Sequence, residues 1–229
     1  MNPIIDIIIP AYNEASSVGL VIKAIPMEMV REIVVCDNAS TDDTSEVAIN
    51  AGATVVKQPR KGYGSACLAG MDHLKRKQVP PDIVAFLDAD FSDHPEELPA
   101  LVDPIIKKNM DLVIGSRALG NVEEGAMMPQ QVFGNWLATN LIRLFYGYHF
   151  TDLGPFRTIR YSALLDLDMQ DPDFGWTVEM QIKAAKQKLK CIEVPVNYRR
   201  RIGVSKVSGT IKGTILAGHK ILWTIFKLW

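Results

Sequence analysis

The stretch IIDIIIPAYNE, residues 4–14, combines the two signals that decide the fold. Residues 4–9 form a short and almost wholly apolar run, which is typical of a strand buried on both faces of a sheet. Pro10 ends this run, and polar residues follow it at 12–14. The same order, an apolar run and then polar side chains, recurs along the first half of the chain.

Four further apolar runs predict strands at residues 33–36, 53–57, 83–87 and 112–114. Helical patterns separate them at residues 16–25, 43–51, 64–77 and 95–108. This alternation predicts an α/β fold, Rossmann-like, with a mostly parallel central sheet flanked by helices. Ligands of such sheets bind beyond the carboxyl ends of the strands, so the polar residues there are the candidates for chemistry.

The alternation breaks after Arg117. The pattern then predicts a loop at 118–131, a helix at 132–146, extended chain from 152 to 159, a helix at 177–187, a strand at 189–198 and a basic loop at 199–208. No linker divides the chain, so we expect one domain over residues 1–208, whose halves meet at 117, followed by a helix over 209–229.

Composition narrows the class of protein. The chain has 229 residues, of which 48% are hydrophobic and 22% charged, which is typical of a globular protein. Its three cysteines are scattered, which fits a reducing compartment. We expect no secretory signal and no membrane span, because the start is not basic and no run of about 18 apolar residues occurs. Residues 194–229 carry seven basic and no acidic side chains, so an anionic partner is expected there.

Two carboxylates follow the strand predicted at 83–87, in the order Asp88-Ala89-Asp90. Both can approach one hard cation, and Mg²⁺ or Mn²⁺ held in this way takes its other ligands from water and substrate phosphates. The alternative is a pair of solvated turn residues. The neighbouring polar strand ends favour the metal site.

Other polar strand ends have both a ligand-binding and a structural interpretation. Asp37 is suited to accept hydrogen bonds from a base or a ribose, or else to cap a helix. Tyr12 can lie against a flat base or pack at the edge of the core. Lys61 and Gly62 begin a glycine-rich turn before a helix, where backbone N–H groups are available to an anion.

The chain resembles the family 2 inverting glycosyltransferases of the GT-A fold, because it contains three of their motifs in the same order. These motifs are PAYNE at 10–14, DNASTD at 37–42 and DADxxxxP at 88–95. Within that family the chain is most similar to the dolichyl- and polyprenyl-phosphate sugar synthases, because it contains RRIGVSK at 200–206 after EVPV at 193–196. The resemblance implies one GT-A catalytic domain, with a nucleotide-sugar and metal half up to residue 117 and an acceptor half over 118–208.

The resemblance also implies roles for single residues. The nucleoside site would contain Pro10, Ala11, Tyr12, Glu14 and Asp37. The diphosphate and the Mg²⁺ or Mn²⁺ ion would lie at Asp88, Ala89 and Asp90, and Ser116 and Arg117 would border the sugar and acceptor. Asp152 stands where the family often places a functional acid. A mobile basic loop with Arg200, Arg201 and Lys206 would meet phosphates.

Some positions depart from the family pattern. Asn38 and Ala39 replace the usual acid and glycine of the second motif, and Glu123, Glu124, Gln130 and Gln131 occupy a loop in which the lipid-phosphate synthases carry a further arginine. The stretches at 154–157 and 175–180 differ from those of the mannosyl enzymes. A UDP-sugar is therefore favoured over GDP-mannose as the donor.

The nature of the acceptor decides whether a base is needed. A hydroxyl acceptor requires one, and Asp152 and then Glu179 are the candidates. A phosphate acceptor is already ionised and requires only positioning and charge shielding, which arginine and lysine supply.

The predicted C-terminal helix bears on whether the acceptor is bound at a membrane surface. Its basic stripe contains Lys212, His219, Lys220, Trp223 and Lys227, and apolar residues fill most of the remaining circumference. Such a helix can lie in a membrane interface, pack on the sheet or on a second subunit, or lead into a transmembrane region beyond Trp229.

Three hypotheses about function follow. The first is transfer of a hexose from a nucleotide sugar to a polyprenyl or dolichyl phosphate, by a cytoplasmic protein at the inner face of the membrane. The second is the same donor chemistry onto a soluble or glycan hydroxyl. The third is a nucleotide-sugar binding protein without turnover. No nucleic-acid partner is expected, and a homo-oligomer is compatible with the sequence.

Overall fold

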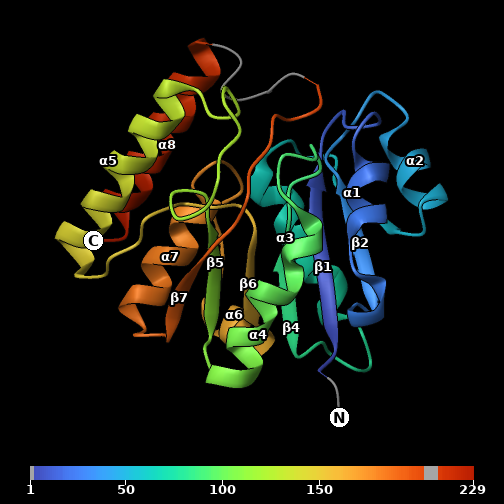
Figure 1. Cartoon of the computed structure of the whole chain (residues 1–229), viewed down its shortest axis with the longest axis horizontal. Coiled ribbons are helices and arrows are strands. Elements are labelled where there is room, and N and C mark those ends of the chain that lie inside the picture. Colours follow the sequence, from blue (N-terminus) through green and yellow to red (C-terminus); the bar gives the residue numbers. More distant parts are fainter. Residues whose placement is uncertain (1–2, 204–210) are drawn as a thin grey trace.

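A seven-stranded sheet forms the centre of the computed structural model, which describes residues 3–203 and 211–229 (Figure 1). The strand order is β3-β2-β1-β4-β6-β5-β7. The strands are β1 (Ile5–Ala11), β2 (Glu32–Asp37), β3 (Thr54–Lys57), β4 (Ile83–Phe86), β5 (Leu112–Ser116), β6 (Arg157–Arg160) and β7 (Cys191–Pro195). All neighbouring pairs are parallel except those of β6, which is antiparallel to β4 and β5. The prediction of a mostly parallel α/β sheet is confirmed.

Helices cover both faces of this sheet. One face packs against α1 (Val18–Ala24), α2 (Thr44–Asn50) and α4 (Leu98–Lys108). The other packs against α3 (Tyr63–Lys75), α6 (Tyr161–Asp166) and α7 (Trp176–Lys186), with α5 (Pro129–Tyr146) and α8 (Ile211–Lys227) beyond them. Two short 3₁₀ turns lie at Met27–Met29 and Pro95–Glu97. Side chains alternate between the two cores along each strand, so that Ile7 belongs to one and Ile8 to the other.

The first strand extends one residue beyond Pro10, which the sequence predicted as its end. Pro10 lacks a backbone N–H, yet it pairs in register with Cys36 of β2. Its backbone faces the β4 side, because Ile8, two residues earlier, accepts a hydrogen bond from Leu87 on that side. The pairing with β4 ends at Ile8, so no donor is required of Pro10.

The second half of the chain completes the same sheet. The predicted helices at 132–146 and 177–187 are α5 and α7, and α5 begins three residues earlier, with Pro129 in its first turn. Of the extended segment predicted from 152 to 159, only the end becomes a strand, β6, which lies between β4 and β5. Both predicted halves therefore contribute strands to one continuous sheet.

The C-terminal helix α8 lies beside α5 at one end of the molecule (Figure 1). Ile225 and Thr224 are buried, and the Tyr146 hydroxyl donates a hydrogen bond to the Ile225 carbonyl. One side of this helix packs on α5 and α7, where the sequence offered packing on the sheet or on a second subunit. Among the residues that the structure describes, no helix has the length and apolar character needed to cross a membrane.

Candidate active site

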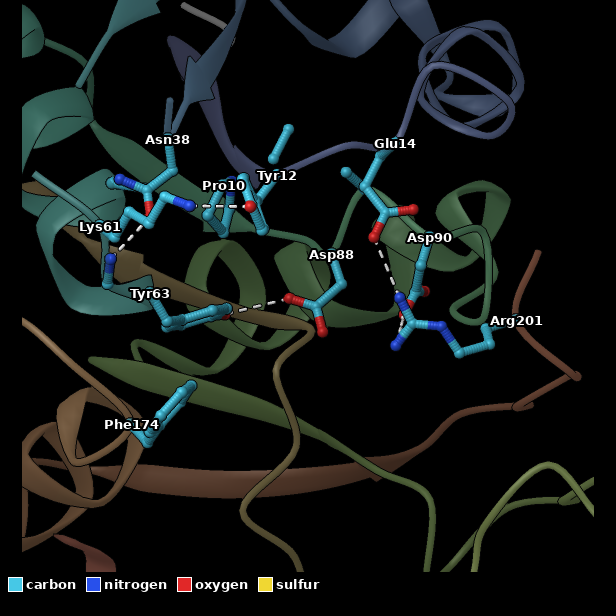
Figure 2. A pocket seen from close by; sticks show the side chains of 14 residues that line it. Pro10, Tyr12, Glu14, Asn38, Lys61, Tyr63, Asp88, Asp90, Phe174 and Arg201 are labelled. Atoms are coloured by element: carbon cyan, nitrogen blue, oxygen red, sulfur yellow. Dashed lines mark hydrogen bonds and ion pairs between the residues drawn. The ribbon is translucent and has the colours of Figure 1, made fainter. Parts of the chain in front are cut away.

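A pocket of about 310 Å³ opens beyond the carboxyl ends of β1, β2 and β4 (Figure 2). Ten of its lining residues are ones that the sequence singled out: Pro10, Ala11, Tyr12, Glu14, Lys61, Gly62, Asp88, Ala89, Asp90 and Arg201. Four more line it: Asn38, Tyr63, Ala66 and Phe174. The parallel strands bring the first group together, because their carboxyl ends share one edge of the sheet.

Two carboxylates close together in sequence, those of Asp88 and Asp90, line this pocket. Asp90 is buried and accepts hydrogen bonds from the Ser92 backbone N–H at 2.9 Å and the Ser92 hydroxyl at 2.5 Å. Asp88 accepts one from the Tyr63 hydroxyl at 3.1 Å. Burial and the neighbouring Asp90 carboxylate raise the pKa of Asp88 above its usual range. A cation bound between the two carboxylates would relieve this cost of ionising Asp88.

This pair suits a divalent ion that is completed by a ligand. Hard cations prefer carboxylate oxygens, and Mg²⁺ or Mn²⁺ commonly keeps only one or two of them. Over residues 3–203 and 211–229, no group of three or more histidine, cysteine, aspartate or glutamate side chains is arranged to hold a metal by itself. The other coordination positions of an ion bound by Asp88 and Asp90 would be filled by water and by oxygen atoms of a bound molecule.

Arg201 lines the pocket beside Asp90 and Glu14 (Figure 2). Its guanidinium forms ion pairs with Asp90 and with Glu14, both at 3.0 Å. Arg200 points elsewhere, because it is largely exposed and its guanidinium donates to the Glu124 carbonyl. Lys206 lies outside the described residues. Among the described residues of the predicted basic loop, 199–203, only Arg201 lines the pocket.

Asp37, which was predicted to line the nucleoside site, is buried and is not among the lining residues of the pocket, whereas its neighbour Asn38 is. Asp37 is buried and bound by Lys57 at 2.7 Å, by the Ser40 backbone N–H at 2.9 Å and by the Ser45 hydroxyl. Burial alone would raise the pKa of Asp37, but these donors outweigh it and lower the pKa to about 2. The Asn38 amide accepts a hydrogen bond from Gly62 N–H at 2.7 Å and donates to the Arg60 carbonyl at 2.6 Å.

These contacts of Asp37 predict a pH dependence of stability. The carboxyl titrates near 3.9 in an unfolded chain, so its contribution is complete above about pH 4 and is lost as the pH falls towards 2. We expect Asp37→Asn to remove about 1–2 kcal/mol from the difference in unfolding free energy between about pH 5 and about pH 2. Urea unfolding at several pH values measures this. Asp43→Asn, at an exposed position nearby, is the control, and equal slopes for the two variants would contradict the assignment.

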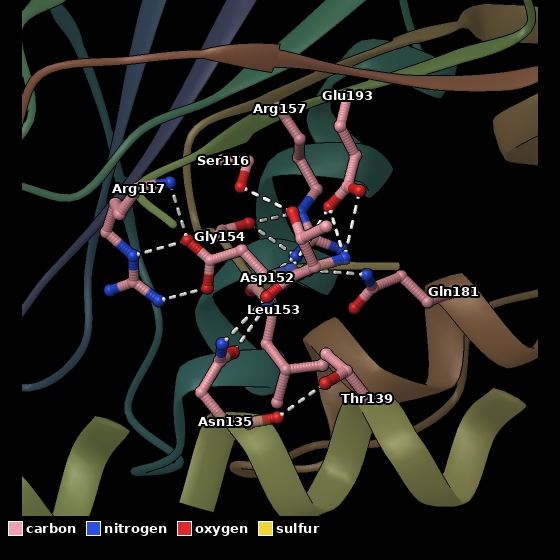
Figure 3. A network of polar contacts seen from close by, with 11 residues as sticks. Ser116, Arg117, Asn135, Thr139, Asp152, Leu153, Gly154, Arg157, Gln181 and Glu193 are labelled. Carbon is pink, nitrogen blue, oxygen red and sulfur yellow. Dashed lines mark hydrogen bonds and ion pairs between the residues drawn. The ribbon is translucent and has the colours of Figure 1, made fainter. Parts of the chain in front are cut away.

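Asp152 and Arg117 form a buried ion pair outside the pocket (Figure 3). Both oxygens of Asp152 are engaged, since the guanidinium contacts them at 2.7 and 2.8 Å and the Arg117 N–H donates at 2.8 Å. The Asp152 side chain is 1% exposed and that of Arg117 is 12% exposed. Arg117 also lies over the Tyr198 ring. In this arrangement Asp152 orients Arg117. Both carboxylate oxygens of Asp152 are occupied by Arg117, so neither is available to take a proton from an acceptor.

The chain around Asp152 is held by further polar contacts (Figure 3). Glu193 accepts hydrogen bonds from the backbone N–H groups of Thr151 and Asp152, and Gln181 donates to the Asp152 carbonyl. The Ser116 and Thr151 hydroxyls lie 2.7 Å apart. Arg157 is fully buried and donates to the carbonyls of residues 153, 154 and 177. These contacts fix the segment that presents Asp152 to Arg117.

Glu179, the second candidate base, lies on α7 and does not line the pocket. Its carboxylate accepts hydrogen bonds from the backbone N–H groups of Gln170 and Asp171, the latter at 2.7 Å. It also pairs with Lys183 at 2.8 Å. Glu179 therefore orders the loop before α7.

Two aromatic lining residues, Tyr63 and Phe174, were missed from the sequence. Tyr63 follows Gly62 in the glycine-rich turn, and its place at the first position of α3 was the available signal. Phe174 comes from a loop far along the chain, and no local pattern indicates it. A third aromatic residue, Tyr12, was predicted, and the Lys61 ammonium lies 4.5 Å from its ring centre.

Comparison with solved structures defines the class of fold. The chain superposes on glucosyl-3-phosphoglycerate synthase from Mycobacterium tuberculosis with a TM-score of 0.78 and 22% identity, covering 99% of this chain and 78% of that one. That protein was crystallised with Mn²⁺, uridine diphosphate and phosphoglyceric acid. The fold is the GT-A fold of nucleotide-sugar glycosyltransferases, as the motifs predicted.

Sequence comparison then identifies the family. The model of glycosyl transferase family 2 matches residues 6–168. An uncharacterised glycosyltransferase of Mycobacterium tuberculosis is 38% identical, covering 93% of this chain and 94% of that one. An undecaprenyl-phosphate mannosyltransferase of Micrococcus luteus is 31% identical, and the match covers 97% of this chain and 94% of that one. A dolichyl-phosphate hexose transferase of Haloferax volcanii is 30% identical, and the match covers 88% of this chain and 85% of that one. This chain belongs to glycosyl transferase family 2 and is a glycosyltransferase.

Proposed function

We propose that this enzyme moves a hexose from a nucleoside diphosphate sugar, a UDP-sugar in preference to GDP-mannose, to a polyprenyl or dolichyl phosphate, with Mg²⁺ or Mn²⁺. The donor half of the proposal is supported by the carboxylate pair Asp88 and Asp90, which lines one pocket together with Arg201. A solved structure of the same fold holds Mn²⁺ and uridine diphosphate. Two relatives along most of this chain are named as transferases to undecaprenyl and dolichyl phosphate.

Different residues of the pocket would bind the base, the metal ion and the diphosphate of the donor. Tyr12 and Lys61 form a flat, cationic wall suited to a base, and Asn38 supplies polar atoms beside it. Asp88 and Asp90 would hold the metal ion, which when bound supplies positive charge to the departing diphosphate. Arg201 can share that task, since its guanidinium already lies 3.0 Å from Asp90.

The acceptor half rests on the state of the two candidate bases. Asp152 is engaged by Arg117, and Glu179 is held within the loop before α7. A phosphate acceptor needs neither, because its oxygen is ionised at neutral pH and can attack the anomeric carbon as the bond to the diphosphate breaks. Transfer in this way inverts the anomeric configuration. A hydroxyl acceptor would require Asp152 to leave Arg117 first, which makes it the second candidate.

Calorimetric titration tests the donor half of this proposal. UDP-glucose, UDP-galactose, UDP-GlcNAc and GDP-mannose are each titrated with and without Mn²⁺. We expect one UDP-sugar to bind only when the ion is present. Transfer from that donor is then measured to a polyprenyl phosphate and to a glycan hydroxyl. Binding of no donor would overturn the proposal, and transfer to the hydroxyl alone would support the second candidate.

We further propose that α5 and α8 rest on the inner face of the cytoplasmic membrane. Exposed large apolar side chains gather on these two adjacent helices and directly after α8: Val132, Phe133, Trp136, Leu144, Ile215, Leu216, Trp223, Phe226 and Trp229. Arg143 and Lys227 are exposed on the same helices. Aromatic and basic side chains together favour an anionic membrane interface, where a lipid phosphate would be met.

Vesicle flotation tests the membrane proposal. We expect the protein to float with vesicles that contain anionic lipid, and Trp136→Ser with Trp223→Ser to weaken partitioning about tenfold or more, because two large side chains leave the interface. Leu20→Ser with Ile49→Ser changes exposed apolar residues on α1 and α2, at the other end of the molecule, and should have no effect. Equal flotation of both double variants would remove α5 and α8 from the membrane.

A further inference from the structure

Phe174 lines the donor pocket from a segment that belongs to neither the glycine-rich turn nor the strand ends. It lies in the loop 170–175, which leads into α7 (Figure 2). In the pocket it comes from the side opposite the Asn38 and Pro10 wall. The contacts that hold this loop therefore determine the position of Phe174 in the pocket.

On the pocket side, the loop is bound to the start of α3. Gly64 N–H donates to the Asp173 carbonyl at 3.2 Å, and Ser65 N–H to the Pro172 carbonyl at 2.7 Å. The two backbones approach so closely that a Cβ at Gly64 would lie 1.9 Å from the Asp171 carbonyl oxygen. The loop is thus packed directly against the start of α3, next to the turn that contains Lys61 and Gly62.

On the far side, the C-terminal helix α8 holds the same loop. The Lys220 ammonium forms an ion pair with Asp171 at 3.0 Å and lies 3.8 Å from Asp173. The pair is partly buried, with Lys220 28% and Asp171 10% exposed. Thr224, one turn further along α8, packs so closely on Gly175 that a Cβ there would lie 2.3 Å from its hydroxyl. Asp171 also accepts the Asp173 N–H at 2.8 Å.

We propose that Lys220 is a positioning residue for the donor site, and that α8 acts through it to set the place of Phe174. This inference rests on the proposed function, in that the pocket is taken to bind the nucleotide sugar. The loop has contacts on three sides, from α3, from Glu179 of α7 and from α8. Among these contacts, the α8 contact is the one in which a side-chain ion pair holds the loop.

Lys220→Met is the variant that tests the inference. Met keeps the length of the side chain and its packing but leaves Asp171 without its ammonium partner. We expect the affinity for the UDP-sugar with Mn²⁺ to fall about tenfold, as for the loss of a partly buried ion pair. Lys220→Arg keeps the charge and should restore affinity. Lys108→Met, at an exposed lysine of α4, is the matched control.

Hydrogen exchange of the ligand-free protein provides a readout that does not require donor binding. In Lys220→Met we expect faster exchange of the backbone amides of residues 170–176, and unchanged exchange in β1 and β2. Faster exchange here, in a protein that binds no nucleotide sugar, would uphold the contact while the proposed function fails. Unchanged exchange, or an equal loss of affinity in Lys220→Arg, would overturn the inference.

Discussion

Asp90→Asn is expected to lower metal-dependent turnover of the sugar donor about a thousandfold, equivalent to about 4 kcal/mol of transition-state stabilisation. Asp90 is one of the two carboxylates available to a divalent ion in the pocket, and it also pairs with Arg201. An amide has the same shape but no charge, so it would weaken both interactions. The measurement is Mn²⁺-dependent release of nucleoside diphosphate at saturating donor.

The controls separate loss of the ion from loss of the fold. Circular dichroism should be unchanged, because Asn can still accept the Ser92 hydrogen bonds. Asp103→Asn changes an exposed carboxylate on α4 and should leave turnover at the wild-type rate. Full activity of Asp90→Asn would remove this residue from the metal site.

Asp152→Asn is expected to destabilise the fold by about 3 kcal/mol, because it leaves the Arg117 guanidinium buried without a counter-charge. In a chain of this size the melting temperature should fall by about 10 °C, as seen by calorimetry or circular dichroism. The size of this effect follows from burial of the pair and from the three contacts that Arg117 makes with one carboxylate.

The matched control removes both charges. Arg117→Gln combined with Asp152→Asn leaves no unpaired ion, so it should be more stable than Asp152→Asn alone. An unchanged melting temperature for Asp152→Asn, together with loss of transfer to a hydroxyl acceptor, would identify Asp152 as a base. The same variant thus distinguishes a phosphate acceptor from a hydroxyl acceptor.

Most of the sheet could be predicted from local patterns. Strands β1, β2, β4 and β5 are short apolar runs that differ clearly from the helical stretches between them. The strand β6 is an exception, since its sequence Arg-Thr-Ile-Arg has no continuous apolar run. It is buried because its neighbours β4 and β5 cover its two edges, and the long side chain of Arg157 is satisfied by carbonyls from other segments. Such partners are not visible in a window of sequence.

Local patterns were enough to predict that Tyr12, Asp88 and Asp90 meet at one edge of the sheet, because they follow strands that run in parallel. Asp37 was predicted for the same place, but its neighbour Asn38 lines the pocket instead. Three other features are visible only in the folded chain: Asp152 is engaged by Arg117, Glu179 binds the loop before α7, and Phe174 of that loop lines the pocket. Each of these depends on side chains from separate elements packed in three dimensions, whereas a local pattern reports only the period and polarity of its own segment.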